Sequence, residues 1–166
     1  MTGHFENWML NNSGKSDAWF PDPPLSLQTV SVKLIDSLVS RAISLGENVR
    51  MCLHEQGTTG LQCMIIAQHS HLFDLPKNAD AGGKLFNILK GELQLVTFVD
   101  GRFLVASSSL LNKDVPVGFV RQGRTYVDVP RSEISVHLEI ASSISTRTTP
   151  DWVKGLSRST INSIIP

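Results

Sequence analysis

The sequence predicts a mainly β domain of the sandwich or barrel type, preceded by one amphipathic helix. Between residues 49 and 140, short runs rich in β-branched and aromatic residues alternate with turn residues. One of these turns, Asp100-Gly101, lies between two β runs and indicates a hairpin. Many short strands joined by regular turns are typical of sandwiches and barrels.

Length, composition and charge narrow the possible classes of protein. The chain has 166 residues, 41% of them hydrophobic, and a formal net charge of zero. This length predicts one domain with terminal extensions. Zero net charge gives no electrostatic reason to expect a nucleic acid or an anionic membrane as partner. The longest apolar runs, such as residues 61–67, are too short to span a bilayer.

The first 31 residues are predicted to form an irregular leader. Asn-Asn-Ser-Gly at 11–14 and Pro-Asp-Pro-Pro at 21–24 interrupt regular structure. The leader nevertheless contains Trp8, Trp19 and Phe20. Large exposed apolar side chains are unfavourable, so we expect these three to pack against the body of the domain or against a second subunit.

A helix is predicted over residues 32–45. Ser31 can cap its start and Gly46 can end it. Its apolar residues recur at a spacing that gathers them on one helical face: Val32, Leu34, Ile35, Leu38, Val39, Ala42 and Ile43.

Strands are predicted after the helix, followed by a tail. The strand candidates are residues 49–54, 61–67, 69–75, 85–89, 93–99, 102–107, 118–121, 125–129 and 134–140. The tail, residues 142–166, is rich in Ser and Thr. Within it, Trp152, Val153 and Leu156 predict one apolar turn of helix.

The two cysteines, Cys52 and Cys63, do not make a disulfide framework. The N-terminal residues lack the basic region and apolar core of a secretory signal. We therefore expect reduced thiols in a cytoplasmic protein.

Residues 76–91 resemble the first motif of the WbuC-type cupins, small metal-binding proteins found with cell-surface polysaccharide genes. In that family Pro-His-x-His is followed by a Glu five residues after the second His, and then by an apolar strand that runs into a Gly turn. The match has no gap. Lys77 and Ala79 stand at the two histidine positions, and Lys84 stands at the glutamate position.

The resemblance covers about residues 32–141. Tyr126 falls on the family's third histidine, and Glu139 is retained in the last strand. The resemblance implies a cupin-type jelly-roll β-barrel with an N-terminal helix, lying between the leader (1–31) and the tail (142–166). The further matching segments are residues 50–54, 62–67, 123–126 and 136–140.

At the matched positions the metal ligands are replaced. Ammonium groups repel a divalent cation, Ala79 offers no lone pair, and Tyr126 could ligate only as a phenolate. We therefore expect no metal and no other cofactor at the usual site. A metalloprotein that uses His54, His69, His71 or His137 instead remains an alternative.

The same positions predict a pocket for a small molecule. Lys77 and Lys84 are expected to favour an anion, with hydrogen bonds from Tyr126 and His54 and with Glu139 on the cavity side of the last strand. We expect a sugar or a small anion as ligand, such as a sugar phosphate, a nucleotide sugar or a carboxylate.

Three functions follow from these observations. The first is a metal-free binding or accessory cupin linked to sugar or polysaccharide metabolism. The second is a metal-independent epimerase or isomerase with His54 and Tyr126 as catalytic candidates. The third is the metalloprotein with non-standard histidines. A homodimer is expected for each of them.

Overall fold

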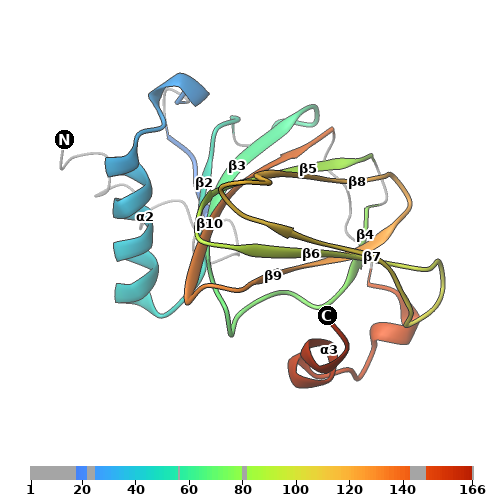
Figure 1. Cartoon of the computed structure of the whole chain (residues 1–166). Coiled ribbons are helices and arrows are strands. Elements are labelled where there is room, and N and C mark those ends of the chain that lie inside the picture. The colour runs from blue at the N-terminus through green and yellow to red at the C-terminus, as the bar shows by residue number, and fades with distance from the viewer. Residues whose placement is uncertain (1–17, 22–24, 56, 80–81, 143–148, 166) are drawn as a thin grey trace.

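The protein consists of two β-sheets that face each other, with one long helix on one side and a short helix on the other (Figure 1). This computed structural model describes residues 18–21, 25–55, 57–79, 82–142 and 149–165. The six-stranded sheet has the order β1-β2-β3-β10-β5-β8, and the four-stranded sheet has the order β4-β9-β6-β7. The predicted mainly β fold with an N-terminal helix is confirmed, although the two-residue strand β1 precedes the helix, within the leader that was predicted to be irregular.

The strands are short and almost all antiparallel. Their bounds are β1 Ala18–Trp19, β2 Val49–Cys52, β3 Gln62–His69, β4 Lys77–Asn78, β5 Lys84–Lys90, β6 Leu93–Phe98, β7 Val105–Leu111, β8 Val117–Val120, β9 Thr125–Pro130 and β10 Ile134–Ala141. The helical segments are η2 Leu27–Thr29, α2 Val32–Leu45, η3 Asp151–Val153 and α3 Arg158–Ile164.

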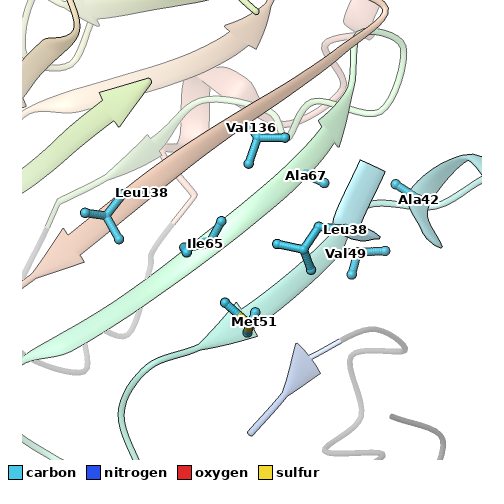
Figure 2. Close-up of a cluster of buried hydrophobic side chains, with 8 residues drawn as sticks. All are labelled: Leu38, Ala42, Val49, Met51, Ile65, Ala67, Val136 and Leu138. Carbon is cyan, nitrogen blue, oxygen red and sulfur yellow. The ribbon is translucent and has the colours of Figure 1, made fainter. Parts of the chain in front are cut away.

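Helix α2 has the predicted bounds because both of its ends are capped. The Ser31 side chain accepts a hydrogen bond from the Leu34 amide, and Gly46 takes the left-handed conformation with φ 66°. Its apolar face, with Leu38 and Ala42 fully buried, packs on the outer face of β2, β3 and β10 (Figure 2). This cluster comprises Leu38, Ala42, Val49, Met51, Ile65, Ala67, Val136 and Leu138.

The alternation of side chains along β10 decides which residues point between the sheets. Val136 and Leu138 pack in the α2 cluster on the outer face. Because successive side chains in a strand point to opposite faces, Ser135, His137 and Glu139 face the other sheet. All three are buried, so the interior of the barrel contains polar groups.

The outer face of the four-stranded sheet is covered by the C-terminal segment. Val127 and Val129 of β9 pack there with Ile161 of α3. Trp152 lies against the Phe98 and Phe103 rings, with centroid distances of 5.3 and 5.4 Å. The predicted apolar turn at residues 152–156 is thus a short 3-10 helix, and α3 extends the helical segment further than the sequence indicated.

One predicted strand is wrong. Residues 70–76 contain no strand, because β3 runs through to His69 and the chain then turns, with the Leu72 amide bonded to the His69 carbonyl. Strand β7 also begins later and ends later than the predicted 102–107. The Asp100-Gly101 hairpin is confirmed, since β6 and β7 pair antiparallel on either side of it.

Trp8 of the leader lies outside the described residues. Phe20 packs against the cluster of Cys52, Met64 and Ile66, in agreement with the expectation that the leader contacts the body. Cys52 and Cys63 are both free thiols. Of the helices in the described part of the chain, none has the length and apolar character needed to cross a membrane.

Candidate functional site

The four positions matched to the cupin metal ligands converge on Tyr126 in the barrel interior. Lys77 of β4 is the register partner of Tyr126 on β9. The Lys84 Nζ atom lies 5.5 Å from the centroid of the Tyr126 ring. Ala79 is fully buried in the same apolar cluster as Tyr126. The chain therefore brings these side chains to one place, although their chemistry differs from that of a metal site.

Lys84 forms a buried ion pair with Glu139, which projects from the neighbouring strand β10. Their side chains are 2% and 4% exposed. A charge buried this deeply is tolerated only when it is paired and hydrogen-bonded. The ammonium group that was expected to attract an anion therefore already has a carboxylate partner in the protein.

Lys77 has a carboxylate partner too. Its ammonium group pairs with Asp74, and Arg50 lies at 4.0 Å from the same carboxylate. The Asp74 side chain is 48% exposed, so this group of charges borders the solvent.

His137 is fully buried, and neither of its ring nitrogens has a hydrogen-bond partner among the described residues. Its ring lies 5.7 Å from that of Phe86, and its Nε2 atom is 3.9 Å from Asp128 Oδ2, which is too far for a direct hydrogen bond. Burial lowers the pKa of His137, while Asp128 and Glu139 oppose that shift. The imidazole is therefore held neutral, with one nitrogen as donor and one as acceptor.

Asp128, on β9 opposite His137, is also buried. Burial raises the pKa of its carboxyl group, while His137 and Lys77 act in the opposite direction. The two sheets thus bring a neutral imidazole and a poorly solvated carboxyl group face to face. Neither group belongs to the matched metal positions.

His54, a predicted catalytic candidate, lies just beyond the end of β2. The Leu53 amide donates to the Cys63 carbonyl oxygen, and the Cys63 amide donates to His54 Nδ1 at 3.1 Å. The His54 ring packs edge-on against Phe20. These contacts hold the His54 side chain against Cys63 and Phe20.

The His69-Ser70-His71 segment does not present two imidazoles to one site. His69 is buried beside α2, where Nε2 lies 2.9 Å from the Ala42 carbonyl oxygen. His71 is exposed beyond the end of β3. Their rings touch at a centroid distance of 5.2 Å.

The residues present do not fit a metal ion at the usual cupin position. Two of the four matched side chains are ammonium groups held by carboxylates, and a third is Ala79. Within the described ranges, no three His, Cys, Asp or Glu side chains gather in a way that could hold a metal. We therefore derive no chemistry through a metal at this site.

Asp128 was not predicted as a site residue, and His137 was predicted only as an alternative metal ligand. Both lie at inward positions of strands whose outward neighbours are apolar, Val127 and Val129 for Asp128, and Val136 and Leu138 for His137. A charged residue in a strand covered on its outer face indicates an interior polar group. The sequence did not reveal that α3 covers β9, so Asp128 could equally have faced solvent.

Comparisons with known proteins agree with this architecture. No protein-family model and no curated protein matches the sequence. The oxalate decarboxylase of Bacillus subtilis, described with Mn(II) centres, is 10% identical, with a TM-score of 0.50 over 70% of this chain and 31% of its own. This chain thus spans about a third of the decarboxylase.

Two further solved structures are similar. A cupin superfamily protein of Desulfitobacterium hafniense is 18% identical over 58% of this chain and 78% of its own, with a TM-score of 0.47. The Cnp3 cupin domain of Schizosaccharomyces pombe is 13% identical over 71% of this chain and 68% of its own, with a TM-score of 0.46. The fold is a cupin-type jelly-roll β-barrel with an N-terminal helix, as predicted.

Proposed function

We propose that this protein is a cupin that binds a small organic molecule inside its barrel. The observation that carries the proposal is the fully buried His137 ring, both of whose nitrogens lack a hydrogen-bond partner within the described residues. Leaving such a group unpaired costs about 1–3 kcal/mol. A bound molecule with polar groups would remove that cost.

The exposed fractions of four polar side chains support a route by which a ligand enters the barrel. The exposed fraction of the side chain rises from 0% for His137 to 11% for Asp128, 12% for Lys77 and 48% for Asp74. A polar molecule that enters past Lys77 and Asp74 would reach Asp128 first and His137 last. Because the His137 side chain is closed to solvent, binding requires the structure to open locally beside Lys77 and Asp74.

The biological setting is proposed on the resemblance alone. The match to WbuC-type cupins over residues 32–141 favours a binding or accessory role in sugar or polysaccharide metabolism in the cytoplasm. A sugar or a small anion is the ligand expected on that basis, and a homodimer is the expected assembly.

A second candidate function is a metal-independent epimerase or isomerase. The observation that favours it is the neutral imidazole of His137 facing the Asp128 carboxyl group across 3.9 Å. A neutral imidazole near a carboxyl group can exchange a proton with a substrate. His137 and Asp128 are better placed for this role than His54, and Tyr126 remains a third candidate in the same interior.

A ligand screen that also follows turnover tests both functions. Purified protein is incubated with monosaccharides, nucleotide sugars and small carboxylates, and thermal unfolding and product formation are measured. Ligands that raise the melting temperature without reacting support the binding protein, and an altered sugar product supports the enzyme. If no compound of these classes binds, the proposal is wrong.

A further inference from the structure

His137 and Asp128 form a gap of a particular size between the two sheets. The 3.9 Å between His137 Nε2 and Asp128 Oδ2 exceeds a hydrogen bond by about 1 Å. One oxygen atom beside the line that joins them, at about 2.8 Å from each, would be close enough to bond both, with about 90° between the two hydrogen bonds. The gap is therefore too wide for a direct hydrogen bond and narrow enough for one oxygen atom to bridge.

The charges around the gap argue against an anionic oxygen. Lys84 is paired with Glu139, and Lys77 is paired with Asp74. A carboxylate or phosphate that entered would meet Asp128 at the gap, and Glu139 acts electrostatically on His137 from the same strand. Arg50 is the remaining cation that acts on His137, and it lies close to Asp74. An anion would gain little here and would lose its hydration.

A neutral hydroxyl group suits the same surroundings. It both donates and accepts a hydrogen bond, so it can complement a neutral imidazole and a carboxyl group in either protonation state. The nearby Phe86 and Tyr126 rings, 5.9 Å apart, offer apolar faces for a C–H surface. A hydroxyl group attached to a compact carbon skeleton combines both properties.

We propose that His137 and Asp128 together bind one hydroxyl group of a neutral sugar or polyol, bridging the two sheets through that oxygen. The inference rests on the proposed binding function and names its ligand class. The two proposed binding residues lie outside the positions matched to metal ligands. Lys84 and Glu139 stay paired with each other.

The experiment follows the His137 ring nitrogens by NMR in the full chain during titration with probe compounds. The neutral probes are glucose, galactose, mannose and rhamnose, and the anionic probes are phosphate and acetate. Binding of each probe is also measured for H137F and D128L. The matched controls are H71F and D100L, which change an exposed His and an exposed Asp.

The expected result is that a neutral sugar shifts the His137 ring resonances. H137F and D128L should each weaken its binding about tenfold or more, since each removes a hydrogen bond to the hydroxyl group, while H71F and D100L leave it unchanged. If H137F fails to fold, the binding to D128L and the ring resonances of the unmodified protein still test the inference.

Three other results would overturn the inference. A sugar that binds without moving the His137 resonances, and equally well to D128L, would place the ligand elsewhere and leave the proposed binding function standing. Interior binding of phosphate or acetate in preference to sugars would refute the ligand class alone. Absence of binding by every probe would contradict both the inference and the proposed function.

Discussion

Lys84 and Glu139 carry opposite charges on neighbouring strands, and both are almost excluded from solvent. Such a pair contributes little net stability while intact, because desolvation offsets the attraction, but removing one partner is costly. The pair therefore places one positive and one negative charge in the interior, and the two charges compensate each other.

Replacing Lys84 by methionine should lower the free energy of unfolding by about 3–5 kcal/mol, because Glu139 keeps a buried charge without its ammonium partner. The double variant K84M/E139L should recover most of that loss. Chemical denaturation measures both. Lys90→Met, which breaks the exposed pair with Asp36, is the matched control and should change stability by less than about 1 kcal/mol. A K84M protein as stable as the wild type would contradict the description of this pair.

The pH dependence of stability should reveal the buried His137. Its pKa is lowered in the folded protein from the ordinary value of 6.5, so the unfolded chain binds a proton that the folded chain resists. Stability from this group is present above pH 6.5 and is lost as pH falls below it, at up to about 1.4 kcal/mol per pH unit. Denaturation at pH 7.5 and 5.5 should show a smaller loss for H137F than for the wild type.

Asp128 acts in the opposite direction. Its raised pKa favours the folded protein below the ordinary value of 3.8, and this contribution is lost as pH rises through the folded pKa. Comparing the stability of D128N with that of the wild type over the same pH range isolates the effect of Asp128.

If H137F and H71F showed the same pH dependence of stability as the wild type, His137 would not be a buried neutral group.

At the scale of elements, helix α2 depends on its caps as well as on its apolar face. Ser31→Ala removes the hydrogen bond to the Leu34 amide and should destabilise the protein by about 1 kcal/mol. Ser44→Ala, on the exposed face of the same helix, is the control and should have no cost. Equal stability of the two variants would show that the cap is dispensable.

The elements were predictable where local chemistry defines them. Ser31 and Gly46 give α2 its bounds, and Asp100-Gly101 gives the β6–β7 hairpin. The segment 69–75 has the composition of a strand, but the chain turns after His69 and Phe73 packs in the cluster beneath α3. Helix α3 has few apolar residues, so its position depends on tertiary packing that the sequence does not display.

For the candidate site, the resemblance singled out Lys77, Ala79, Lys84 and Tyr126, which lie near one another in the structure. It could not indicate the ion partners of the two lysines, since Asp74 and Glu139 come from other segments. Asp128 was missed because only the packing of β9 between the other sheet and α3 makes it an interior residue.

For the whole molecule, we predict that the purified protein contains no stoichiometric transition metal. The reason is that Lys77, Ala79 and Lys84 stand at the positions matched by resemblance to metal ligands, and both ammonium groups are paired with carboxylates. Elemental analysis after purification without an affinity tag checks this. About one Fe, Mn, Ni or Zn per chain would contradict it.

Assembly is a separate property of the whole molecule. We expect a homodimer, because the leader carries large apolar residues in addition to those that the barrel itself buries. Light scattering at micromolar concentration measures the mass. A monomer would contradict this expectation without affecting the description of the interior.

The most direct test of the central claim is a crystal structure of the protein as purified, examined between His137 and Asp128. We predict a non-metal oxygen within hydrogen-bond distance of both His137 Nε2 and Asp128 Oδ2, with Lys84 still paired to Glu139. A metal ion bound to His137, or a direct His137–Asp128 hydrogen bond with no atom between them, would contradict the account.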